Sequence, residues 1–178
     1  MNQGPLSALL NLPVIAQVRR NHALEHATMQ VLSEHNNALT LMGRSSLWGF
    51  YIYGNVDTGE VVDAAREGLR RLKAGERGMA IHPNCGSNYV VAGAIAGMGA
   101  FAALGGLSRN RREGLMDRLA RLPLAWAVGT LGVIVSRPLG AVVQAHVTTK
   151  AEVGDLRIVE VVRNERAGTV VHVVRTES

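Results

Sequence analysis

The stretch from Tyr89 to Leu107 constrains the fold most, because it contains no charged residue over 19 positions. A helix of this length rises almost as far as the hydrocarbon core of a bilayer is thick. Apolar runs this long are uncommon in small soluble domains. The sequence therefore predicts a membrane-spanning helix, with a pair of buried helices in a soluble oligomer as the alternative.

A second apolar block runs from Leu122 to about Val143 and is interrupted by Arg137 and Pro138. An arginine can extend its charge to the lipid headgroups or face a polar cavity. A proline can kink the helix or start a new one. Together the two blocks predict an inserted hairpin of two transmembrane helices over residues 89–143.

The connector between the blocks, Ser108–Arg121, carries five arginines against Glu113 and Asp117. The positive-inside tendency would place this connector in the cytoplasm and both chain ends outside. However, the amino terminus shows no conventional signal peptide, and a lone cysteine suits the reducing cytosol. We favour cytoplasmic chain ends in a bacterial cell membrane. The orientation stays open, because the connector can also lie along a surface of anionic lipid.

Composition bears on the partners of the chain. The formal net charge is +5 at pH 7, but only 4% of the residues are aromatic, and the arginines cluster beside the apolar blocks. Nucleic-acid binding is therefore not expected, and anionic lipid near the arginine-rich connector is the expected partner. Gly93 and Gly97 form a face of small residues, which favours close helix packing and predicts a homo-oligomer through the glycine-rich helices.

The polar part before the apolar blocks predicts a mixture of helices and strands. Asn11 can cap a helix that has Pro13 in its first turn and continues to about His35. Two strands are expected next, joined by the turn GRSS, and then a second helix. The expected ranges are Leu39–Met42 and Leu47–Tyr53 for the strands and Glu60–Ala74 for the helix.

The carboxyl-terminal part predicts a β-hairpin. Leu156–Val162 and Thr169–Arg175 have the alternation of strands, and the sequence RNERAG between them is typical of a turn. We expect this hairpin to pair with the amino-terminal strands. The predicted fold is thus α+β, with a polar region over 1–88, the membrane hairpin over 89–143 and a closing β-hairpin over 144–178.

The first predicted helix contains the sequence H-x-x-E-H, formed by His22, Glu25 and His26. Residues three and four positions apart share one face of a helix, so two imidazoles can reach one point with a carboxylate beside them. The pattern is similar to the inverzincin signature, in which both histidines bind zinc and the glutamate is the general base. A partly exposed helix face without metal is the alternative for this motif taken alone.

A later sequence, IHPNCGSN, can supply the remaining ligands. Pro83, Asn84 and Gly86 favour a sharp turn, which lets His82 and Cys85 converge. Cys85 is the only cysteine, so packing, thiolate chemistry and metal ligation are its open roles. Three imidazoles and a thiolate suit Zn²⁺, although another transition metal also fits. The predicted metal ligands are His22, His26, His82 and Cys85.

The combination of an H-x-x-E-H helix with a later HPxCG turn before an apolar helix resembles the YqhQ-like family of uncharacterised bacterial membrane proteins. The residues that carry the resemblance are His22, Glu25, His26, His82, Pro83, Cys85 and Gly86. The resemblance implies a membrane location and a metal, but no substrate. Asn84 stands where a basic residue is common in that family, and this chain is shorter, which suits a sister group with a different activity.

These patterns lead to three hypotheses for function. In the first, the protein is a membrane-bound zinc hydrolase whose Glu25 activates water for attack on an amide or ester. In the second, the protein is a non-catalytic scaffold with a structural metal or none, because a closed site of four protein ligands leaves no position for water. In the third, Cys85 is a nucleophile. Ligation by Cys85 separates the first two hypotheses.

Overall fold

The structure, a computed structural model, describes residues 4–106, 114–166 and 168–178. Leu107, part of the arginine-rich connector and one residue of the RNERAG turn therefore lie outside the described residues. The chain divides into two units, the first made of Met1–His82 with Gln144–Ser178 and the second of Pro83–Val143. The second unit is thus inserted between two segments of the first.

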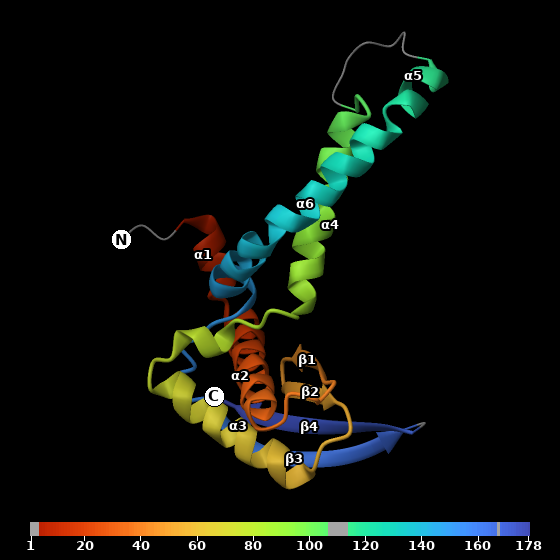
Figure 1. Ribbon diagram of the computed structural model, residues 1–178. Helices are drawn as coiled ribbons and strands as arrows, with labels where there is room; N and C mark the ends of the chain where they lie inside the picture. The colour runs from red at the N-terminus through yellow and green to blue at the C-terminus, as the bar shows by residue number, and fades with distance from the viewer. Residues whose placement is uncertain (1–3, 107–113, 167) are drawn as a thin grey trace. The chain divides into compact units, whose positions relative to one another are not determined.

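The first unit combines helices with a four-stranded sheet. Its elements are α1 (Pro5–Leu10), α2 (Pro13–His35), β1 (Met42–Ser46), β2 (Gly49–Tyr53), α3 (Thr58–Lys73), the 3-10 helix η1 (Arg77–Ala80), the π-helix η2 (Gln144–Thr148), β3 (Arg157–Arg166) and β4 (Thr169–Glu177). The sheet is antiparallel with the order β1-β2-β4-β3, and Figure 1 shows it beside α2 and α3. The α+β class is confirmed. The predicted pairing of the carboxyl-terminal strands with the first strands is also confirmed, because β4 pairs with β2.

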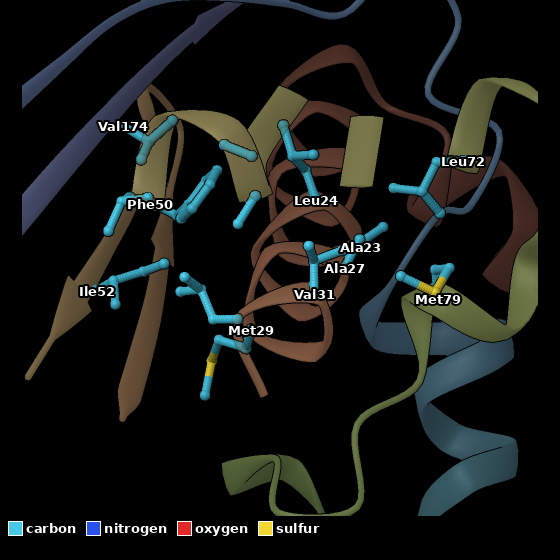
Figure 2. Packing of buried hydrophobic residues seen from close by; sticks show 14 of the residues in the cluster. Ala23, Leu24, Ala27, Met29, Val31, Phe50, Ile52, Leu72, Met79 and Val174 are labelled. Carbon is cyan, nitrogen blue, oxygen red and sulfur yellow. The ribbon is translucent and has the colours of Figure 1, made fainter. Parts of the chain in front are cut away.

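Helix α2 forms the centre of the core. Leu24 and Val31 of this helix are buried, and Figure 2 shows Phe50 and Ile52 of β2 pointing toward it from the sheet. Helix α3 approaches α2 closely at Gly68, where a Cβ atom would lie 3.0 Å from backbone and side-chain atoms of α2. Because this helix is packed on several sides, the positions of its side chains are set by the core.

The first β-hairpin differs from the prediction. The expected turn GRSS lies within β1, and the turn falls at Leu47 and Trp48 instead. Gly49 has a φ of 136° and begins the return strand, which explains the shift because this backbone conformation favours glycine. The register also places Ser45 opposite the buried Phe50.

The start of α2 differs from the prediction in its capping residue. Helix α2 begins after Leu12 rather than after a capping Asn11, whose side chain instead donates to the carbonyl of Ser7 in α1. Pro13 occupies the first turn as predicted. At α3, Asp57 is the N-cap, and its carboxylate accepts a hydrogen bond from the backbone N–H of Gly59 at 2.7 Å.

The second unit contains α4 (Gly86–Ala103), α5 (Leu115–Ala120) and α6 (Leu122–Val143). Helix α6 has the predicted bounds and continues through Arg137 and Pro138 without ending. Within the described residues, one helix is long and apolar enough to cross a membrane, Leu122–Thr148, with a mean hydropathy of 1.5. Only 17% of its most apolar 18-residue stretch is buried, so it differs from a typical core helix of a soluble domain.

Helices α4 and α6 pack along each other within the second unit (Figure 1). They approach closely at Gly132, where a Cβ atom would lie 3.0 Å from the backbone of Ala96. Gly99 similarly faces Val128. A Cβ atom at Gly93 or Gly97 would meet no described atom within 4 Å, so this pair of helices does not use the predicted small-residue face.

His172 is fully buried on the core side of β4. Its Nε2 atom lies 3.1 Å from the hydroxyl of Thr58, while its Nδ1 atom is buried without a hydrogen-bond partner among the described residues. Burial lowers the pKa of this imidazole below its usual value, and the positive charge of Arg163 acts in the same direction. The carboxylate of Asp57 opposes the shift. His172 is therefore neutral in the folded chain at neutral pH.

The stability of the first unit is expected to depend on pH through His172. Below about pH 6.5 the unfolded chain binds a proton at this ring and the folded chain does not, so the free energy of unfolding falls as the pH decreases. In His172→Val this contribution is absent. Thermal unfolding at pH 7.5 and pH 5 should show a larger decrease for the wild type than for the variant. Equal decreases would contradict the assignment.

Candidate metal centre

His22 and His26 lie one helical turn apart on α2, as the spacing predicts. Their ring centroids are 4.3 Å apart, and both belong to a group whose ligand atoms lie within 4.8 Å of one another. His26 is buried and His22 is partly buried. The helix therefore presents two imidazoles at a spacing that allows both to reach one ion.

Backbone carbonyl groups orient both rings. The Nδ1 atom of His26 lies 2.8 Å from the carbonyl oxygen of Ala80, and that of His22 lies 2.9 Å from the carbonyl oxygen of Thr148. A carbonyl can only accept a hydrogen bond, so each Nδ1 must carry the proton. In the neutral ring the lone pair is then on Nε2, which is the arrangement that metal-binding histidines have in proteins.

Helix α2 also positions the segment that leads to His82. The side-chain amide of Gln30 donates to the carbonyls of Met79 and Ile81, at 3.0 and 2.9 Å. The Nδ1–H of His26 donates to the carbonyl of the residue between them. Three successive carbonyls are thus bound to side chains of one helix, which fixes this segment against α2.

The π-helix η2 contributes two further contacts. The side chain of Gln144 is fully buried, and its Oε1 atom accepts a hydrogen bond from the backbone N–H of His82 at 2.8 Å. Thr148, at the other end of η2, provides the carbonyl that binds His22. Single π-helical turns often occur at functional sites, and here one turn positions two of the predicted ligands.

The remaining predicted ligands differ in their placement. The ring of His82 lies 5.7 Å from that of His26, between centroids, but His82 is not in the group that could hold an ion together. Cys85 follows His82 by three residues, belongs to the second unit and is the N-cap residue of α4. Its thiol is buried and lies 3.1 Å from the hydroxyl of Ser87.

Glu25 faces the sheet. Its side chain is 4% exposed, and its carboxylate accepts a hydrogen bond from the hydroxyl of Ser45 in β1. Gly43 of the same strand leaves room for this carboxylate, because a Cβ atom there would overlap it. The carboxylate of Glu25 therefore lies between its own helix, α2, and the edge strand β1.

Other residues around the site were not identified from the sequence. Gln30 continues the stripe of His22 and His26 at a spacing of four, and this periodicity was a usable signal. Gln144 follows directly after the second apolar block, and no pattern singled it out. His35, a further histidine of α2, binds the carbonyl of Val31 near the end of the helix, at 2.8 Å.

The chain was compared with known proteins. Residues 17–161 match a domain of unknown function, DUF6391. An uncharacterised protein of Picosynechococcus sp. is 31% identical over 168 residues, which cover 89% of this chain and 78% of that protein. The chain belongs to the DUF6391 family. The family description names no activity or metal, and it is not that of the YqhQ-like family. No solved structure matches the chain.

The region matched by DUF6391 contains most of α2, together with η1, the turn with His82 and Cys85, and η2. The matched region therefore spans every residue of the candidate centre. Chemically, the first unit offers two oriented Nε2 atoms with a third imidazole nearby, while the buried carboxylate of Glu25 on the same helix faces β1. Neutral imidazoles of this kind are ligands for zinc and for several other divalent transition metals.

Proposed function

We propose that this protein is a membrane-bound zinc-binding protein with a hydrolytic activity, in which His22, His26 and Cys85 are the zinc ligands. The observation that carries the proposal is the pair of hydrogen bonds from the two Nδ1 atoms to backbone carbonyls. Each bond fixes the tautomer with its proton on Nδ1, in which Nε2 is the atom suited to bind a metal. A merely solvated histidine face does not need two such bonds at once.

Cys85 completes the proposed ligand set. His22, His26 and Cys85 each offer a donor atom of the kind that zinc prefers, and Cys85 is the proposed third ligand. The sequence position of Cys85 supports this role, because Cys85 follows His82 by three positions, and the backbone N–H of His82 is bound to Gln144 within the first unit.

The proposed location is the cell membrane, with α4 and α6 as a hairpin of two spans. Large apolar side chains on both helices are exposed, among them Val90, Met98, Trp126 and Ile134. Such a surface is costly in water and suited to lipid. We place the first unit on the cytoplasmic side, where a thiol ligand stays reduced, and propose contacts of the arginine-rich connector with anionic lipid. The small-residue face of Gly93 and Gly97 would serve a homo-oligomer.

Three protein ligands leave one zinc position open, which is typical of catalytic sites. Zinc in such a site lowers the pKa of water and polarises a carbonyl oxygen. Glu25, three positions from His22, would accept the proton from water during attack on an amide or ester. Its hydrogen bond to Ser45 would hold the carboxylate in place.

A structural metal is the second candidate function. Two observations favour it: the ring of His82 lies near that of His26, and the carboxylate of Glu25 is engaged by Ser45. If His82 turned toward the ion, four protein ligands would close the site. The protein would then be a scaffold in which the metal joins α2 to the turn before α4.

Metal analysis of the purified full-length protein tests the proposed function. We expect about one zinc per chain. The Co²⁺-substituted protein should then change its visible spectrum when azide is added, because an open position admits an external ligand. A spectrum that azide does not change, but that changes in His82→Ala, would favour the structural metal. Purification without any bound metal from zinc-supplemented cells would contradict both candidates.

A further inference from the structure

Exposed apolar side chains gather at the amino-terminal end of the first unit. We name this feature the N-terminal apolar surface, and its members are Leu6, Leu9, Leu12, Val14 and Trp48. Each is about half exposed or more, and the indole of Trp48 is 75% exposed. Val14 and Trp48 line the same surface groove, so the start of α2 and the β1–β2 turn form one continuous surface.

Arg19 connects α1 to the residues that follow the apolar helix in the chain. Its guanidinium donates to the carbonyl of Leu10 at 3.1 Å, and to the carbonyls of His146 and Thr149 at 2.9 and 2.8 Å. The helix that is long and apolar enough to cross a membrane ends at Thr148. The amino-terminal helix is therefore fastened, within the first unit, to the very end of that segment.

The end of a membrane span lies where the hydrocarbon core gives way to the headgroups. In the proposed membrane location, α1 would therefore lie near the depth of the headgroups, because it is bound to that end. Tryptophan is enriched at this depth, since its ring is apolar and its N–H can bind water or a headgroup. We propose that the N-terminal apolar surface dips into the interface of the bilayer and orients the first unit on the membrane.

The cations around α1 indicate the lipid class. Arg19, Arg77 and Lys150 line one pocket with residues of α1. The carboxylate of Glu152 in this lining pairs with Arg77 at 2.9 Å, so the lining keeps a net positive charge through Arg19 and Lys150. Lys150 reaches the side chain of Asn11 at 2.9 Å, just after α1. A positive rim beside a shallowly inserted apolar surface favours anionic headgroups. The partner is thus a bilayer that contains anionic lipid.

This inference rests on the proposed membrane location. The two tryptophans of the chain allow the membrane location and the insertion of the N-terminal apolar surface to be tested separately. Trp126 lies in α6. Each single variant keeps one tryptophan, so the fluorescence of Trp126→Phe reports on Trp48 and that of Trp48→Phe reports on Trp126. Both variants are reconstituted in vesicles of phosphatidylcholine with a minor share of phosphatidylglycerol. Quenching by aqueous iodide and by brominated lipid measures exposure to water and to lipid.

A tryptophan at position 42 provides the matched control, in the triple variant Met42→Trp, Trp48→Phe, Trp126→Phe. Met42 is exposed at the other end of β1, roughly 20 Å along the strand from the turn. We expect iodide to quench Trp48 about threefold less than the tryptophan at position 42, and brominated lipid to quench Trp48 alone of the two.

Three outcomes would overturn the inference. If Trp48 is as accessible to iodide as position 42 while Trp126 is sheltered, the surface does not enter the interface although the span is in the membrane. If Trp48 is sheltered from iodide but not quenched by brominated lipid, a second copy of the chain covers the surface instead. If Trp48 and Trp126 are both accessible to iodide, the proposed membrane location itself fails.

Discussion

Replacing His26 by alanine is expected to lower the zinc affinity of the protein by about 100-fold or more. The substitution removes one of two imidazoles that the helix holds within 4.8 Å of each other. It also removes the hydrogen bond to the carbonyl of Ala80, which helps to fix the segment before His82. Competition with a chromophoric chelator measures the affinity, and far-UV circular dichroism verifies that the chain remains folded.

His35→Ala is the matched control, because it removes a histidine from the same helix. His35 binds the carbonyl of Val31 within α2 and is outside the group that could hold an ion. The zinc affinity of His35→Ala should equal that of the wild type within a factor of about two. Equal losses in the two variants would indicate that the helix, rather than a ligand, was affected. An unchanged affinity in a folded His26→Ala would remove this histidine from the ligand set.

Replacing Gly49 by alanine is expected to destabilise the first unit by about 3 kcal/mol or more. Gly49 has a φ of 136°, which L side chains rarely adopt, and an added Cβ atom would overlap the backbone carbonyl oxygen of Val174. Because β2 pairs with both β1 and β4, the overlap disturbs the middle of the sheet. The unfolding free energy in denaturant measures the effect.

Gly78→Ala is the control for this prediction. A Cβ atom at Gly78 would meet no described atom within 4 Å, so a change within about 0.5 kcal/mol is expected. If Gly49→Ala were as stable as Gly78→Ala, the hairpin would have to tolerate a displaced β4. The close approach of Gly49 to Val174 at the β1–β2 turn would then be wrong.

Helices with strong boundary signals could be predicted from the sequence. Helix α2 begins at Pro13 and ends at His35, where a proline in the first turn and the pair Asn36-Asn37 favour these limits. Helix α6 has the predicted bounds because its apolar run is long and uniform. The pairing of β4 with β2 could be expected because the carboxyl-terminal hairpin and the polar region before the apolar blocks both carry strand patterns.

Positions set by tertiary contacts could not be predicted in this way. The turn at Leu47 and Trp48 carries no turn-forming residue, and its place depends on Gly49 and on the contact of Ser45 with Glu25. The same holds for the candidate site. The spacing of His22 and His26 is visible in the sequence, but the carbonyls that orient their rings could belong to any residue.

The insertion of the second unit has a consequence for synthesis. Strand β2 leaves the ribosome long before β4, because the paired residues Tyr51 and Val173 are roughly 120 positions apart. Contacts this distant in the chain form slowly. During synthesis the edge of β2 therefore has no β4 to pair with while the apolar helices are being made, and this unpaired edge can aggregate with other chains. The sheet is complete only once β4 has been made, and a chain truncated before β4 would be a target for proteolysis.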